Sequence, residues 1–159
     1  MTTFSRENAY AALFTLASNG EGLTGKITWG AGQSLAYTSR RVKLWDDLPA
    51  QPALCQAEHG ETLVNGLTPP YLRILKAMWL IFHKVDDGEI AATTDNQILD
   101  AVELALKSVP GDVGYPERNT LGGIVENVFI DGAIIKVPGD LDGQALIAVP
   151  ISIQAPLDL

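Results

Sequence analysis

The strongest helical pattern in the chain lies between residues 93 and 109, in the segment TTDNQILDAVELALKSV. Its apolar residues recur at the spacing that places side chains on one face of a helix. The residues of this face are Ile98, Leu99, Val102, Leu106 and Val109. Thr94 or Asp95 is expected to cap the N-terminus of the helix, because short polar side chains accept hydrogen bonds from the first free backbone N–H groups.

The same spacing predicts a helix near the start of the chain. Its apolar face consists of Tyr10, Leu13, Phe14 and Ala17. Ser5 is the expected N-cap and Gly20 the expected stop. The glycine-rich segment of residues 20–35 then predicts a long flexible loop, with a short hairpin strand at residues 26–29.

The remaining hydrophobic runs predict strands. The segment YLRILKAMWLIFHK, residues 71–84, is largely apolar at both even and odd positions, which is typical of a long strand covered on both faces. AYTSRRVKLW and ALCQAEHG are also rich in residues that favour strands. After a long loop at residues 110–120, the β-like runs LGGIVENVFID, GAIIKVPG and QALIAVPISIQA close the chain.

The order of helix, strands, helix and strands predicts an α+β fold. We expect one domain over residues 1–159, with an antiparallel or mixed sheet and two main helices packed on one face. The single cysteine, Cys55, excludes a disulfide within the chain. No apolar run reaches the ~18–20 residues of a membrane span, and the apolar run at residues 9–17 lacks the basic start of a signal peptide. We therefore expect a soluble intracellular protein.

The charge balance narrows the range of partners. With 11 basic against 19 acidic residues, the formal net charge is −8. A protein that clamps nucleic-acid phosphates needs a basic surface, so this function is disfavoured. An acidic surface still suits a passage through which DNA moves without adhering.

No group of residues predicts an active site or a cofactor. The segment GEGLTG, residues 20–25, matches the dinucleotide pattern G-x-G-x-x-G, but it follows a helix where that pattern needs a strand. Asp46 and Asp47 precede Leu48-Pro49, which indicates a turn and not a pair of carboxylates that converge on a substrate. Cys55 is expected to be a buried, unreactive thiol.

Metal binding is not predicted either. The possible ligands fall into two groups, Glu58, His59 and Glu61 in one and His83, Asp86 and Asp87 in the other. Neither group has the spacing of a known metal motif. A single histidine at the end of a strand, such as His83, is expected to lie on the rim of the fold.

The order of these landmarks resembles the tail terminator, or tail-completion, proteins of long-tailed bacteriophages. The resemblance is carried by RRVKLWDDLPAQPALCQ, by LGGIVENVFIDG after a long loop and by the closing AVPISI, and it extends over residues 5–153. It implies a structural virion protein that forms a ring, usually of six copies, on the head-proximal end of the tail tube. Such a ring stops tube polymerisation and joins the tail to the head.

The resemblance also implies a set of partners. They are further copies of the chain, the tail tube protein and the head-completion or connector proteins, while genomic DNA passes through the lumen without specific binding. The protein would be assembled in the host cytoplasm, belong to the virion, contact no membrane and have no enzymatic activity. Another neck or connector protein, or the tail-tube subunit, is the nearest alternative. A small cytoplasmic enzyme or ligand-binding module using Asp46, Asp47 and His59 is the more distant one.

The strand and turn within residues 40–52 are the expected contact with a neighbouring subunit or partner. The residues assigned to this contact are Arg40, Arg41, Trp45, Asp46, Asp47, Pro49 and Pro52. The two arginines suit an anion or an acidic partner, although a solvated strand face explains them equally well. Trp45 is expected to pack at a subunit or core edge. Proline stiffens a loop and so lowers the entropy lost when the loop docks.

Overall fold

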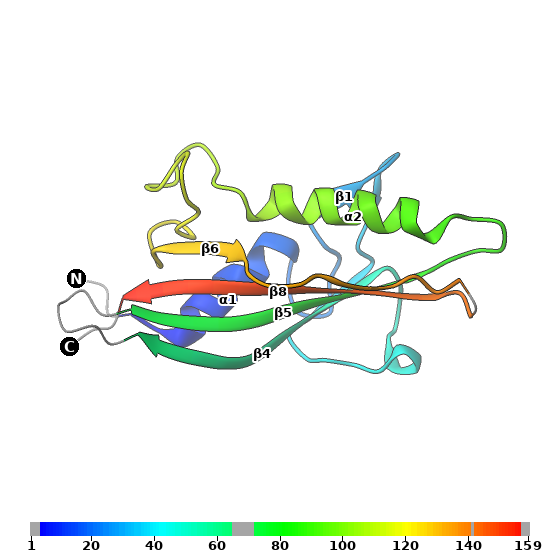
Figure 1. Cartoon of the computed structure of the whole chain (residues 1–159), viewed down its shortest axis with the longest axis horizontal. Coiled ribbons are helices and arrows are strands. Elements are labelled where there is room, and N and C mark those ends of the chain that lie inside the picture. Colours follow the sequence, from blue (N-terminus) through cyan, green and yellow to red (C-terminus); the bar gives the residue numbers. More distant parts are fainter. Residues whose placement is uncertain (1–3, 65–71, 141, 157–159) are drawn as a thin grey trace.

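The computed structural model describes residues 4–64, 72–140 and 142–156. Its helices are α1 (Arg6–Ala17) and α2 (Ala91–Leu106), and a 3₁₀ turn, η1 (Trp45–Asp47), lies between them in the chain. The strands are β1 (Thr28–Trp29), β2 (Gln33–Ser34), β3 (Tyr37–Ser39), β4 (Ala53–Val64), β5 (Leu72–Lys84), β6 (Asn127–Ile130), β7 (Ile135–Val137) and β8 (Gln144–Pro156). Figure 1 shows the long strands β4, β5 and β8 side by side.

Six of these strands form one mixed sheet. The order is β3-β4-β5-β8, and both β6 and β7 pair with the other edge of β8. β3 runs parallel to β4, whereas the remaining neighbours are antiparallel. β1 and β2 form a separate short hairpin within the glycine-rich segment. The predicted α+β fold with a mixed sheet is therefore confirmed.

The main core lies between the two helices and one face of this sheet. In β5 the odd-numbered residues Leu75, Ala77, Trp79 and Ile81 are buried and share a cluster with apolar residues of α1, α2 and β8. The helix faces predicted from the sequence contribute Leu13 of α1 and Ile98 of α2, both fully buried. Ser5 caps α1 as expected, since its Oγ accepts a hydrogen bond from the Asn8 backbone N–H.

The opposite face of the sheet carries no helix. In β5 the even-numbered Ile74, Lys76, Met78 and Leu80 are half-buried there. The prediction of a strand covered on both faces is therefore wrong over most of its length. At one end of this face, Phe82 belongs to a second, smaller apolar cluster that includes Trp45 and Leu48 of the chain around η1.

Two predictions about α2 are also wrong. The helix begins at Ala91, so that neither Thr94 nor Asp95 is its N-cap, and Asp95 is buried instead. Val109 lies beyond the helix and is exposed. The helix ends earlier because the side chain of Asn119 donates a 3.0 Å hydrogen bond to the Leu106 carbonyl, which otherwise lacks a partner at a helix C-terminus.

The strand predicted for residues 36–45 is shorter than expected. β3 ends at Ser39, because side chains bind the next backbone N–H groups. A carboxylate oxygen of Glu21 accepts from the Arg40 N–H at 2.8 Å, and Ser39 Oγ accepts from the Arg41 N–H at 2.9 Å. These donors are thus withdrawn from a β-ladder. From residue 40 the chain leaves the sheet as a loop.

Candidate functional site

The loop of residues 40–52 carries all the residues that the sequence assigned to an interface. It connects β3 to the parallel strand β4, and in Figure 1 it is the cyan segment that leaves the sheet near the start of β4. We call it the β3–β4 loop. The two ends of the loop are half-buried, as are Trp45 and Leu48 near its middle, while most of the residues between them are exposed.

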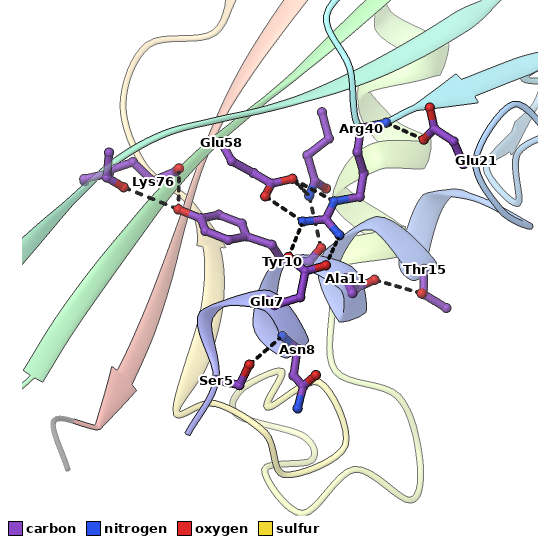
Figure 2. A network of polar contacts seen from close by, with 12 residues as sticks. Ser5, Glu7, Asn8, Tyr10, Ala11, Thr15, Glu21, Arg40, Glu58 and Lys76 are labelled. Atoms are coloured by element: carbon purple, nitrogen blue, oxygen red, sulfur yellow. Dashed lines mark hydrogen bonds and ion pairs between the residues drawn. The ribbon is translucent and has the colours of Figure 1, made fainter. Parts of the chain in front are cut away.

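Arg40 anchors the first end of the β3–β4 loop. Its guanidinium group lies between two carboxylates, Glu7 of α1 and Glu58 of β4, and forms two hydrogen bonds with each (Figure 2). One of the bonds to Glu58 is 2.6 Å long. Because α1 and β4 are distant in the sequence, this ion-pair network fixes the start of the loop relative to both elements.

The network changes the protonation equilibria of its members. Hydrogen bonds with Glu58, and then with Glu7, raise the pKa of the Arg40 guanidinium above its ordinary value. The hydrogen bonds from Arg40 also lower the pKa of Glu7. The guanidinium group of Arg40 is therefore already paired with carboxylates of the same chain. This geometry disfavours the expectation from the sequence that Arg40 binds an external anion or acidic partner.

A buried glutamine continues this network into the core. Gln56 Nε2 donates to the Tyr10 carbonyl oxygen at 3.0 Å, and Gln56 Oε1 accepts from the indole Nε1–H of Trp79 at 2.9 Å. The Tyr10 hydroxyl in turn donates to the Lys76 carbonyl (Figure 2). The polar groups of Gln56 and Trp79 are thus satisfied beneath the ion pairs, which makes this region structural.

The middle of the β3–β4 loop exposes apolar side chains that the sequence reading did not single out. Val42 is 55% exposed and Leu44 is 75% exposed. Arg41 beside them is exposed as well, with its side chain directed to no ion-pair partner among the described residues. The alternation of apolar Val42 and Leu44 with basic Arg41 and Lys43 is typical of a strand, so the sequence predicted a strand here.

Trp45 anchors the middle of the loop to the sheet. Its ring meets Phe82 edge-on, with 5.9 Å between the ring centroids, on the face that carries no helix. Trp45 is half-buried, in agreement with the predicted position at a core edge. An aromatic pair of this geometry stabilises by about 0.5–1.5 kcal/mol beyond its buried area.

The two adjacent aspartates form a turn, as predicted. Asp46 and Asp47 lie in η1 and are exposed, and the Asp47 N–H donates to the Leu44 carbonyl at 3.0 Å. Pro49 is exposed, while Pro52 is half-buried at the start of β4, where its carbonyl accepts from the Ala36 N–H at 2.8 Å. Among the described residues, no other titratable side chain lies within hydrogen-bonding distance of either aspartate.

The other candidates from the sequence have structural explanations. In the GEGLTG loop, a Cβ on Gly25 would lie 2.5 Å from Leu35 Cβ, so glycine is required there by close packing. Cys55 is fully buried, and burial raises the pKa of its thiol, which disfavours the reactive thiolate. No group of three metal-ligating side chains occurs in the described residues, and no described helix is long and apolar enough to cross a membrane.

His83 is not the rim residue that the sequence predicted. It is 2% exposed, and its Nε2 lies 2.6 Å from Oδ1 of Asp95, which is 1% exposed. The pair joins the end of β5 to the first turns of α2. It is separate from the β3–β4 loop network and holds the second helix to the sheet.

Comparisons with known proteins add no further assignment. No protein-family model matches the chain, and no curated protein is similar to it at a significant level.

The Arg40 network leads to a first prediction. Arg40→Ala is expected to lower the free energy of unfolding by about 1–2 kcal/mol, because it leaves Glu7 and Glu58 without their shared cation. Urea unfolding near neutral pH measures this loss. The matched control is Arg41→Ala, which is exposed on the same loop and should change the free energy of unfolding by less than about 0.5 kcal/mol.

The pH dependence of this loss has a definite sign. The pKa of Glu7 is lowered in the folded chain from an ordinary value of 4.5, so the stabilisation by the ion pair is present above that pH. It is lost as the pH falls through the folded pKa. The difference between the native chain and Arg40→Ala should therefore narrow below pH 4.5. An undiminished difference at about pH 3 would contradict this account.

Proposed function

We propose that the chain is a tail terminator of a long-tailed bacteriophage, a structural subunit that forms a ring on the head-proximal end of the tail tube. One observation carries the proposal. One of the three segments that carry the sequence resemblance folds into an anchored loop that presents Val42 and Leu44 to the outside. Two neighbouring exposed apolar side chains on a loop anchored by Arg40 and Trp45 support a surface that is covered on assembly.

A ring made by rotation needs two different surfaces that fit each other. The sheet supplies a suitable pair at its two edges. One row across the sheet pairs Tyr37 with Ala53, Ala53 with Phe82, Phe82 with Leu146 and Leu146 with Val137. The β3–β4 loop continues from one end of this row, and β7 lies at the other end.

The element at each end of this row exposes apolar side chains. β7 exposes Ile135 and Val137, each by about half of its surface, while the β3–β4 loop exposes Val42 and Leu44. We assign the contact between copies to these two surfaces, the loop of one copy against β7 of the next. The contact is heterologous and repeats around a closed ring, for which the resemblance implies six copies.

The acidic character of the chain suits the passage of DNA. Five carboxylate residues gather where the loops after β5 and before β8 meet, namely Asp86, Asp87, Glu89, Asp140 and Asp142. Together with a net charge of −8 per chain, they disfavour adhesion of a polyanion. In this proposal the genome crosses the ring without specific binding, and the loops of residues 20–35 and 110–120 contact the tube protein and the head-completion proteins.

The form of the purified protein separates this proposal from its nearest rival. Negative-stain microscopy of the concentrated protein is expected to show single closed rings, or no assemblies until tail tubes are added. Open filaments of the chain alone would instead identify the tail-tube subunit, because a heterologous contact that does not close continues indefinitely. In either case we propose that the protein belongs to the virion, which is assembled in the host cytoplasm.

A further inference from the structure

The sheet face that carries no helix is apolar over most of its surface. Between residues 74 and 82, the apolar residues that β5 directs to this face are Ile74, Met78, Leu80 and Phe82. The one charged residue among them, Lys76, donates to Ser152 Oγ at 3.0 Å and pairs with Asp131 at 3.2 Å. The sequence of β5 is typical of a strand covered on both faces, but the single chain covers only one of them.

The chain's own β3–β4 loop covers one side of this face. Ala53 of β4 is fully buried and belongs to the cluster against which Trp45 of the loop packs. Exposure then rises along the row of residues that crosses the sheet from Ala53. Phe82 of β5 is 8% exposed, Leu146 of β8 is half-buried and Val137 of β7 is 46% exposed. The loop therefore leaves the side of the face toward β7 uncovered.

This uncovered side is continuous with the β7 surface of the proposed ring contact. Ile135 of β7 lies directly opposite Ala148 of β8, and Ala148 lies opposite Leu80 of β5. Directly opposed residues direct their side chains to the same face of a sheet, with Cβ atoms about 4.5–5.5 Å apart. A partner that touches β7 on this face is therefore one such step from β8 and two steps from β5.

The size of a stable interface also requires a contact that extends beyond β7. The side chains assigned so far to the ring contact are two from each copy, Val42 and Leu44 against Ile135 and Val137. A standard interface buries about 800 Å² on each partner. Over residues 74–82, β5, β8 and the edge strands β6 and β7 present an uncovered face on the order of 400 Å². This face thus supplies about half of the area that one partner contributes to a standard interface.

We propose that the uncovered face around Met78 is buried in the ring beneath the β3–β4 loop of the neighbouring copy. Val42 and Leu44 of that loop lie across β7 and against Leu146 and Met78. Each face is then covered by two loops, the chain's own on the side toward β4 and the neighbour's on the side toward β7. The inference rests on the proposed function, because it extends the contact between copies of the ring.

The test is the rate at which hydrogen peroxide oxidises Met78, followed by mass spectrometry of its proteolytic peptide. The unassembled reference is Leu44→Asp, in which the half-buried thioether of Met78 remains accessible. In native rings, or in the native chain bound at tube ends, oxidation is expected to be at least about tenfold slower, because oxidation of a thioether follows its exposure.

The outcomes separate this inference from the proposed function. If rings or tube caps form and Met78 is oxidised as fast as in the reference, the inference is overturned and the proposed function stands. If the native chain forms neither rings nor caps, the proposed function fails and the inference fails with it. If Leu44→Asp still assembles, the β3–β4 loop is not the covering segment, which overturns the inference.

A disulfide between two copies identifies the covering segment. Leu44→Cys and Leu146→Cys are prepared as separate chains of unequal mass, mixed with tail tubes and oxidised. A covalent pair of unequal chains is expected. The matched control replaces Leu146→Cys by Leu104→Cys, which is exposed on α2 and should give no such pair. The native Cys55 is fully buried and does not compete. Protection of Met78 without this cross-link would assign the cover to the tube protein and overturn the proposal.

Discussion

Leu44→Asp and Val137→Asp are each expected to abolish ring formation and to leave the subunit folded. Both side chains are exposed in the single chain, so a charge there costs little before assembly. In the proposed contact they are covered, and an unpaired carboxylate in an apolar contact costs at least about 2 kcal/mol, or roughly thirtyfold in affinity. Since the loss repeats at every contact of a ring, sedimentation velocity should show only the subunit at concentrations where the native chain forms rings. If the native chain assembles only on tail tubes, neither variant should sediment with the tubes.

The matched control for these variants lies on α2. Leu104 is 69% exposed, close to the 75% of Leu44, but it belongs to neither surface of the proposed contact. Leu104→Asp should therefore assemble as the native chain does. All three variants are expected to unfold in urea within about 0.5 kcal/mol of the native chain. If Leu44→Asp and Val137→Asp assemble as strongly as the native chain, the contact between copies does not involve these two surfaces.

Asp95→Ala is expected to lower the free energy of unfolding by about 2–3 kcal/mol, the largest effect of a single polar substitution proposed for this chain. The carboxylate is the hydrogen-bond partner of His83 at 2.6 Å, and both residues are almost completely buried. Removal of Asp95 leaves both ring nitrogens of His83 unpaired, since Nδ1 already lacks a partner. Urea unfolding followed by tryptophan fluorescence measures the loss.

Two controls define the origin of this loss. Asp100→Ala removes an exposed carboxylate of the same helix and should cost less than about 0.5 kcal/mol. The double variant His83→Phe/Asp95→Ala removes both members, so it should recover part of the loss, because no polar group is then left without its partner. A loss below about 1 kcal/mol in Asp95→Ala would show that the pair does not hold α2 to the sheet.

The helices and long strands could be predicted because their patterns are local. The 3.6-residue spacing identified the buried faces of α1 and α2, and the apolar run before Lys84 identified β5. The ends of these elements could not be predicted in the same way. β3 stops at Ser39 because Glu21 binds the next N–H, and α2 stops at Leu106 because Asn119 binds its carbonyl. Such partners lie more than ten residues away and leave no local pattern.

The sequence carries a local pattern for each member of the His83–Asp95 pair, but not for the contact between them. His83 continues the alternation of Leu75, Ala77, Trp79 and Ile81, which face the helices, and Asp95 precedes Ile98 at a helical spacing. Either spacing is compatible with an inward side chain, although the predictions from the sequence were a rim position for His83 and an N-cap for Asp95. What the sequence could not supply is the register between β5 and α2, which decides that the two meet.

In the candidate interface, too, local features could be predicted and tertiary contacts could not. The sequence correctly placed a turn at Asp46 and Asp47 and an edge packing for Trp45. Arg40 was assigned to an external partner, but tertiary packing brings Glu7 and Glu58 to it from two other elements. The exposed Val42 and Leu44 were missed because their alternation suggested a strand, whereas the chain has already left the sheet.

The central claim is most directly tested by negative-stain microscopy of purified tail tubes mixed with the protein. The account predicts a single ring of fixed diameter at one end of each tube, with the other end bare, and no further elongation of the capped end when tube subunits are added. It also predicts that Leu44→Asp leaves both ends bare while Leu104→Asp caps normally. A protein that remains a monomer and leaves every tube end uncapped would contradict the account.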